Sequence, residues 1–156
     1  MVVSVELDEF DRKILRALQA NADHSMAHLG SVIGLSHTPC WRRLKRLEAE
    51  GVIQKKVTLL DRQHLDLNVT VHAQVRMNDH RPETLERFEH QIQDIPNVLE
   101  CYAVSGEYDY GLKLVTKSIE HYDRVLTRQL LSLPEVASIH SVFALRQVKY
   151  STQLPV

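Results

Sequence analysis

The chain has 156 residues and a formal net charge of −1, with 19 Lys and Arg against 20 Asp and Glu. Hydrophobic residues make up 44% and charged residues 25%, which is ordinary globular usage and excludes a disordered, collagen-like or disulfide-rich chain. The length allows one domain or two small ones. The near-zero total charge argues by itself against a nucleic-acid partner, but the charges are unevenly distributed.

The basic residues gather in one stretch of the chain. Residues 36–60 contain six Lys and Arg and only two acids, Glu48 and Glu50, which gives this stretch a net charge of +4. Residues 61–156 contain ten bases and thirteen acids, a net charge of −3. The distribution therefore indicates a local basic surface on an otherwise slightly acidic chain.

The cysteines and the N-terminal sequence indicate the compartment. Two cysteines, Cys40 and Cys101, are too few for a disulfide framework, so we expect free thiols in a reducing environment. No basic segment followed by an apolar run suggests an export signal, and no uncharged run is apolar enough to cross a bilayer. We expect a cytoplasmic protein with no membrane partner.

The first 51 residues predict three helices. Asp8 or Asp11 can cap the first, and Ser25 a short second helix that Gly34 ends in a left-handed conformation. The third begins after a turn of about two residues and stops at Gly51. The residues expected on the inner faces of the first two are Leu7, Ile14, Leu15, Leu18, Met26, Leu29, Val32 and Ile33. Helix, tight turn and helix are typical of a helix-turn-helix.

The third predicted helix separates apolar from basic residues. Cys40, Leu44 and Leu47 form its buried stripe, with Cys40 as a core thiol rather than a reactive one. The nearly opposite face carries Thr38, Arg42, Lys45 and Ala49, with Trp41 and Arg46 on the flanks. A basic face that begins at a capped helix N-terminus suits the major groove of DNA, where arginine can form a bidentate pair with guanine. The alternative is the solvated basic face of an ordinary helix.

The sequence after this helix adds two further cations. VIQKKVTLLD (52–61) alternates apolar residues with lysines and predicts the short hairpin of a winged motif. The residues expected to contact DNA are Ser36, His37, Thr38, Trp41, Arg42, Arg43, Lys45, Arg46, Lys55 and Lys56.

The second half of the chain alternates strand and helix. The predicted strands cover residues 69–77, 98–104, 110–115 and 136–145, and the predicted helices 82–95 and 119–131. The order β-α-β-β-α-β is that of a ferredoxin-like domain, with residues 61–68 as the connector.

The loop GEYDYG (106–111) joins the two central strands. Its flanking glycines permit close backbone approach, while exposed N–H groups and Asp109 suit the carboxylate and ammonium of an α-amino acid. The alternative is a polar turn without a ligand.

Neither metal binding nor catalysis is indicated. His24 and His28 are four residues apart but lack a nearby third ligand, and no nucleophile–base arrangement has supporting context. His72 and His140 fall on predicted strands, where an interface role is expected. We therefore expect no metal, no cofactor and no enzymatic activity.

Four runs carry a resemblance to a known family. LDEFDRKILRAL and LSHTPCWRRLKRLEAEGVI resemble the DNA-binding segment of the Lrp/AsnC (feast/famine) family, and SGEYDYGLKLV and LRQVKYSTQLPV resemble its amino-acid-sensing domain. The resemblance runs from about Leu7 to Pro155. It implies an α+β chain with a winged helix-turn-helix at 1–60, a linker at 61–68 and a ferredoxin-like, ACT-like (RAM) sensing and oligomerisation domain at 69–156.

The resemblance also implies a function. Members are transcription regulators that bind operator DNA as dimers, often assemble further up to octamers, and respond to an amino acid. The implied effector-binding residues are Val104, Ser105, Gly106, Glu107, Tyr108, Asp109 and Tyr110. Gly111 departs from many relatives, which have a larger apolar residue there. Two alternatives stay open: an amino-acid-binding regulatory subunit of an enzyme, and an architectural DNA-binding protein without an effector.

Overall fold

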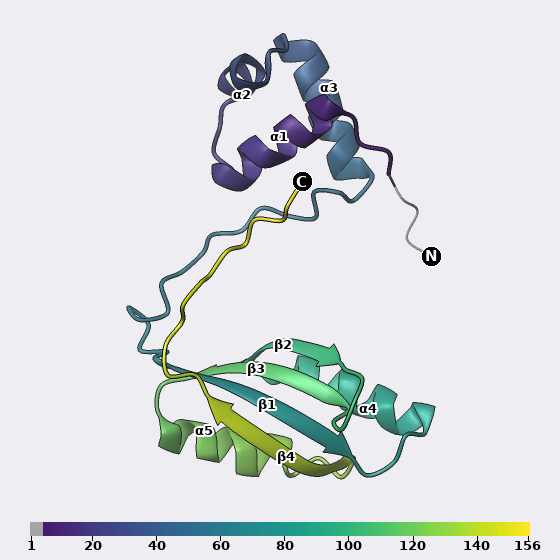
Figure 1. Cartoon of the computed structure of the whole chain (residues 1–156), viewed down its shortest axis with the longest axis vertical. Helices are drawn as coiled ribbons and strands as arrows, with labels where there is room; N and C mark the ends of the chain where they lie inside the picture. The colour runs from purple at the N-terminus through teal and green to yellow at the C-terminus, as the bar shows by residue number, and fades with distance from the viewer. Residues whose placement is uncertain (1–4) are drawn as a thin grey trace. The chain divides into compact units, whose positions relative to one another are not determined.

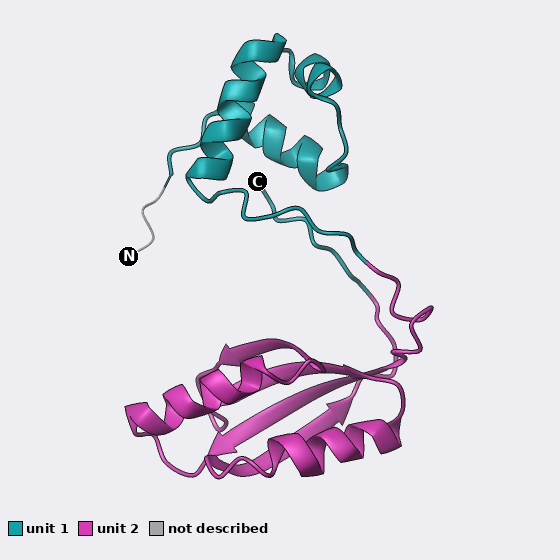
Figure 2. Cartoon of the chain, turned by 180° about the vertical axis from the view of Figure 1, so that it is seen from behind, with its two compact units in different colours: residues 1–59, 149–156 teal, residues 60–148 magenta. Residues whose placement is uncertain are grey.

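A computed structural model describes residues 5–156, so the first four residues of the expected N-terminal domain lie outside it. The chain divides into two compact units, Met1–Leu59 with Lys149–Val156, and Leu60–Val148 (Figure 2). The expected sensing domain extended to residue 156, whereas the last eight residues group with the N-terminal unit. No described helix is both long and apolar enough to span a membrane.

The N-terminal unit contains the three predicted helices, α1 (Glu9–Ala20), α2 (Met26–Ile33) and α3 (His37–Ala49) (Figure 1). Asp8 caps α1 in a reciprocal capping box with Asp11, and the Ser25 hydroxyl accepts the His28 N–H at 3.2 Å. Gly34 ends α2 with φ 76°, as predicted. The buried apolar residues shared by the helices are Ile14, Leu15, Leu29, Ile33, Cys40 and Leu47.

One residue expected inside this core lies outside it. Val32 is 57% exposed, because Leu29 and Ile33 already form the inner stripe of the two-turn helix α2 and Val32 lies about 100° away from Ile33. The predicted inward position of Val32 is wrong.

Gly30 is explained by the turn between α2 and α3. A Cβ on this buried residue would lie 2.6 Å from the carbonyl oxygen of Leu35, and the Leu35 N–H donates to the Gly30 carbonyl at 2.9 Å. The backbone after α2 therefore passes so close to the helix that no side chain fits. This approach sets where α3 begins.

Replacing Gly30 with alanine should lower the free energy of unfolding of this unit by about 1–2 kcal/mol, because overpacking outweighs the better helix propensity of alanine. Urea unfolding followed by the fluorescence of Trp41, the single tryptophan, measures this. The neighbouring exposed substitution Ser31→Ala is the control and should change stability by less than about 0.5 kcal/mol. Equal stability of the two variants would contradict the close approach.

The predicted hairpin over residues 52–61 does not form. No strand lies between Gly51 and Val69 in the described chain. Ile53 donates its N–H to the Leu47 carbonyl at 3.1 Å and packs on the helical core, but the apolar residues beyond it are exposed. A two-stranded hairpin without an apolar surface to cover is marginally stable, so this segment stays extended.

The C-terminal residues pack on α1. Arg16 donates from Nε to the Val156 carbonyl at 2.8 Å, and the Gln19 amide donates to the Leu154 carbonyl at 3.1 Å. Val156 is half-buried against the helical core. The last residues thus complete the N-terminal unit.

The second unit has the predicted β-α-β-β-α-β order. Its elements are β1 (Val69–Met77), α4 (Pro82–Gln93), β2 (Val98–Ala103), β3 (Tyr110–Thr116), α5 (Ile119–Val125), the π-helical turn η1 (Leu126–Leu130) and β4 (Val136–Phe143). The strands form one antiparallel sheet in the order β2-β3-β1-β4. Figures 1 and 2, drawn from opposite sides, show α4 and α5 on the same face of the sheet.

The alternation in β1 separates the two faces of this sheet. Val71, Ala73, Val75 and Met77 are buried under the helices, while the residues between them face the other side. Ile119, the first residue of α5, is 61% exposed. The sheet places the predicted effector loop at the β2–β3 turn.

Candidate functional site

The α2–α3 turn places the N-terminus of α3 at the surface. Ser36 occupies the N-cap position, but its side chain makes no capping hydrogen bond, which corrects the expected cap. Pro39 contributes no N–H in the first turn. The N-terminal backbone N–H groups of His37 and Thr38 therefore have no side-chain cap. Uncapped N–H groups at a helix start favour an anion such as phosphate.

The exposed face of α3 carries Arg42, Lys45 and a half-exposed Trp41, while Cys40 and Leu47 are buried. Burial raises the pKa of the Cys40 thiol, as expected for an inert core residue. Arg42 forms no ion pair with any residue from 5 to 156. Its guanidinium is thus available to a partner.

Two arginines predicted to contact DNA are engaged with α1. Arg43 lies 2.9 Å and Arg46 2.5 Å from the carboxylate of Asp11, which is 1% exposed. Arg43 also contacts Asp8 at 2.6 Å and lies 5.6 Å from the ring centre of Phe10. The Asp11 N–H, more than Arg43, lowers the pKa of the Asp8 carboxyl. These contacts fix α3 on α1.

Two of the remaining predicted cations are also paired. Lys45 lies 2.6 Å from Glu48, and Lys56 lies 2.5 Å from Asp23. Lys55 has no ion pair within the described chain. Sequence reasoning missed the acidic partners of this surface, although the capping positions of Asp8 and Asp11 marked two of them.

The predicted effector loop is exposed at its tip and anchored at its β3 end. Ser105, Gly106 and Glu107 are exposed, and Gly106 has φ 120°. At the β3 end, the buried Tyr110 donates its hydroxyl to Glu89 at 2.7 Å, and burial raises the pKa of Tyr110. The loop therefore offers its backbone to solvent on a firm base.

Charged and aromatic side chains from β1 and β4 surround Tyr108. Arg76 pairs with Glu107 at 2.8 Å and lies 5.5 Å from the centre of the Tyr108 ring. The His140 ring stacks on the same Tyr108 ring, with the two ring centres 6.2 Å apart. Nothing in the sequence separation indicated these contacts, because the β1–β3 and β1–β4 registers bring them together.

Asp109 is held by its own chain. Its carboxylate accepts the Met77 N–H at 2.7 Å and lies 2.7 Å from His80 Nε2. Burial opposes ionisation, but the Met77 N–H, His80 and Arg76 together hold the pKa of the Asp109 carboxyl below its usual value. The carboxylate is therefore anionic and already partnered, an arrangement that the sequence did not reveal.

Gly111 does not create unusual space beside the loop. A Cβ there would lie 3.6 Å from Val104 Cγ1, an ordinary contact distance. A small side chain at position 111 would therefore fit beside Val104.

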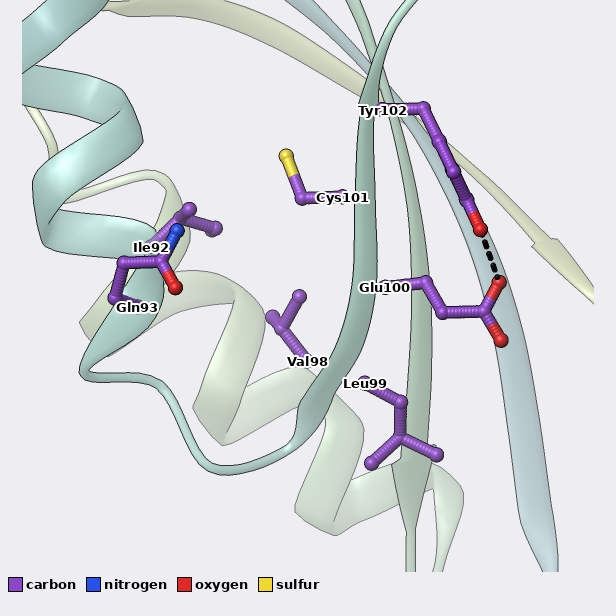
Figure 3. A pocket seen from close by; sticks show the side chains of 7 residues that line it. All are labelled: Ile92, Gln93, Val98, Leu99, Glu100, Cys101 and Tyr102. Carbon is purple, nitrogen blue, oxygen red and sulfur yellow. Dashed lines mark hydrogen bonds between the residues drawn. The ribbon is translucent and has the colours of Figure 1, made fainter. Parts of the chain in front are cut away.

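A separate hollow of about 350 Å³ lies at the β2 edge of the sheet (Figure 3). It is lined by Ile92, Gln93, Val98, Leu99, Glu100, Cys101 and Tyr102, none of which belongs to the predicted effector residues. Burial raises the pKa of Cys101 to about 11, and Tyr102 donates to Glu100 at 3.2 Å. Neither the Cys101 thiol nor the hydrogen bond between Tyr102 and Glu100 supplies a catalytic group.

In the N-terminal unit, the His24 and His28 rings pack against each other with their centres 4.7 Å apart.

Comparison with known proteins covers nearly the whole chain. Residues 7–54 match the winged helix-turn-helix DNA-binding family, and residues 70–154 match the Lrp/AsnC ligand binding domain. The glutamate uptake regulatory protein of Zymomonas mobilis is 42% identical over 150 residues, covering 96% of this chain and 91% of the relative. The transcriptional activator DecR of Escherichia coli is 37% identical, covering 96% and 99%.

Solved structures agree. A transcriptional regulator from Neisseria meningitidis, determined as its L-methionine complex, superimposes with a TM-score of 0.92 at 32% identity, covering 96% of this chain and 97% of the other. An AsnC family regulator from Agrobacterium tumefaciens gives 0.91 at 41% identity, with the same coverage. With both units and nearly the full length matched, the chain belongs to the Lrp/AsnC family of transcriptional regulators.

Proposed function

We propose that this regulator reads operator DNA through the Arg42 face of α3 and changes its DNA binding when an amino acid occupies the loop Val104–Tyr110. One observation carries the DNA half of the proposal. Arg42 is an exposed guanidinium in the middle of α3 with no ion pair in the described chain, while Arg43 and Arg46 are held by α1. A guanidinium so placed suits the O6 and N7 atoms of guanine.

The other predicted contacts have a supporting role on DNA. Lys55 and the N-terminus of α3 suit phosphate oxygens, which position a protein without reading sequence. A homodimer would present two α3 helices to half-sites about one helical turn apart, or a multiple of that. The sheet face opposite α4 and α5 carries His72 and His140 and is the expected pairing surface.

The effector half of the proposal rests on the loop. Its exposed backbone around Gly106 suits a carboxylate, and Asp109 suits an ammonium group. The loop tip is open to solvent in one chain, and the hollow at the β2 edge does not include it. We therefore infer that a second dimer completes the site, so that an amino acid shifts assembly and the spacing of the recognition helices together.

Selection of bound genomic fragments with and without an amino-acid mixture tests both halves. The proposal expects recovery of a defined set of sequences and a change in that set, or in its recovery, when amino acids are added. Recovery of random fragments unaffected by amino acids would favour the architectural alternative. Failure to retain DNA would favour an enzyme's regulatory subunit.

The effector loop makes a separate prediction in thermal unfolding. An amino acid at ten times its Kd adds about 1.4 kcal/mol of stability and should raise the Tm by about 3–6 °C. Asp109→Asn should lose this shift because the ammonium loses its anionic partner. Each variant is compared with its own ligand-free Tm, and Asp123→Asn, on the exposed side of α5, is the matched control. A full shift in Asp109→Asn would remove Asp109 from the site.

A further inference from the structure

Asp109 is bound by its own chain at every polar atom. Its N–H donates to the Val75 carbonyl and its carbonyl accepts the Val104 N–H, both at 2.9 Å. Oδ2 accepts the Met77 N–H at 2.7 Å, and Oδ1 lies 2.7 Å from His80 Nε2. An ammonium group that binds this carboxylate must therefore share an oxygen with a present partner or displace it.

The two carboxylate partners differ in how easily they leave. The Met77 N–H belongs to the end of β1 and cannot move without disturbing the strand. His80 lies on the connection between β1 and α4, and its side chain is 71% exposed. Rotation of its side chain releases Oδ1 to solvent at little cost, since an exposed ion pair contributes little free energy. His80 is thus the exchangeable partner.

We propose that His80 occupies the place of the effector's ammonium on Asp109 and competes with it, which sets the affinity for the amino acid and makes that affinity depend on pH. This inference rests on the proposed binding of an amino acid at Asp109. Both the imidazolium and the ammonium are cationic donors that fit one carboxylate oxygen. His80 consequently occupies Oδ1 of Asp109 until an effector replaces it.

The other charged and titratable groups that face Asp109 and His80 already have partners. Arg76, from β1, is paired with Glu107, and on the His80 connection Asp79 is paired with Arg81, each at 2.8 Å. The other facing groups are His140 of β4, stacked on Tyr108, and Tyr110 of β3, hydrogen-bonded to Glu89. The lowered pKa of Asp109 keeps its carboxylate ionised in the range where histidine side chains in general change charge, about pH 5 to 8.

The sign of the pH effect follows from the competition. At low pH a protonated His80 holds Asp109 and the effector must displace a cation, so binding is weakened. As pH rises, a neutral imidazole competes less, and the affinity increases. The effector's ammonium keeps its charge over the same range. We expect about a two- to fivefold gain in affinity between roughly pH 5.5 and 7.5, the size that an exposed ion pair supports.

The experiment is calorimetric titration of the full-length protein over this pH range. The probe is whichever of the proteinogenic L-amino acids, each at about 10 mM, gives the largest thermal shift. His80→Ala should bind more tightly than the wild type at low pH and show a flat pH profile. His80→Gln, which retains a neutral hydrogen bond, should also be flat but bind nearer to the wild type. His64→Ala removes the comparable exposed pair of His64 with Asp61, 3.0 Å apart, and should keep the wild-type profile.

Three outcomes overturn the inference. Equal pH profiles in the wild type and His80→Ala would show that another group titrates. Weaker binding by His80→Ala at every pH would make His80 part of the site rather than a competitor. If no amino acid shifts the Tm of the wild type or of either His80 variant, the proposed effector function fails, and this inference fails with it; in the first two cases the effector function stands.

Discussion

Replacement of Asp11 by asparagine should lower the free energy of unfolding of the N-terminal unit by about 2–3 kcal/mol. The carboxylate is 1% exposed and receives Arg43 at 2.9 Å and Arg46 at 2.5 Å. Its Oδ2 also accepts the Asp8 N–H at 3.1 Å in the capping box of α1. Asparagine keeps the shape but removes the anion that the two guanidinium groups share, so that within the described chain Arg43 keeps only Asp8, at 2.6 Å, and Arg46 only Glu50, at 4.0 Å.

The size of this effect is limited by the solvent exposure of the arginines. Breaking a fully buried pair costs about 3–5 kcal/mol, but here the side chain of Arg46 is 41% exposed and can be hydrated again. The cap is weakened rather than lost, because an asparagine side-chain oxygen still accepts the Asp8 N–H. The expected value therefore lies below the fully buried range.

Trp41 fluorescence in urea measures the change, because the single tryptophan lies on α3. Glu9→Gln is the matched control: it makes the same change of charge on the same helix. Glu9 meets Arg16 at 3.5 Å in an exposed pair worth less than about 1 kcal/mol. Equal losses in the two variants would mean that the Asp11 contacts do not hold α3 on α1.

The fold was predictable where a local pattern coincides with the tertiary contact. Ser25 and Gly34 mark the two ends of α2, as expected, because a capping residue acts on groups within one turn of the helix. The alternation around Ala73 likewise predicted a half-buried strand. The predicted hairpin after Gly51 does not form, because its stability depends on an apolar surface to pack against. The alternation of residues in the sequence does not show whether such a surface exists. The requirement for glycine at position 30 cannot be predicted from the helical pattern either, because a side chain there would clash with the carbonyl oxygen of Leu35 in the following turn.

The position of the candidate site could be predicted from the sequence, but the ion-pair partners of its residues could not. Helical periodicity placed the basic residues on α3, yet it does not tell which of them meets an acid from another helix. Arg43 and Arg46 meet Asp11 only because α1 packs against that side of α3. The effector loop shows the same limit: strand register, not sequence distance, brings His80 to Asp109. Ion pairs between elements are the part of a site that a single sequence conceals.

Because Arg43 and Arg46 are paired with Asp11, replacement of Arg42 is expected to have the strongest effect on DNA recognition. Arg42→Ala should lower the discrimination between operator and random DNA by about 5- to 150-fold, the loss of one bidentate contact with guanine. Arg42→Lys should lose nearly as much, because an ammonium group lacks the planar fork. The folded state should be unaffected within about 0.5 kcal/mol, since Arg42 is exposed and unpaired among the described residues.

Fluorescence anisotropy with operator and random duplexes at several salt concentrations separates base-specific recognition from electrostatic attraction to the phosphates. Lys55→Ala, the matched loss of one cation, should weaken binding to both duplexes alike and reduce the slope of log K against log salt by about 1. Arg42→Ala should instead weaken operator binding selectively. If Arg42→Ala behaved like Lys55→Ala, Arg42 would contact phosphate, and the residue that reads the bases would have to be sought nearer the N-terminus of α3, at His37 or Thr38, where the backbone lacks a side-chain cap.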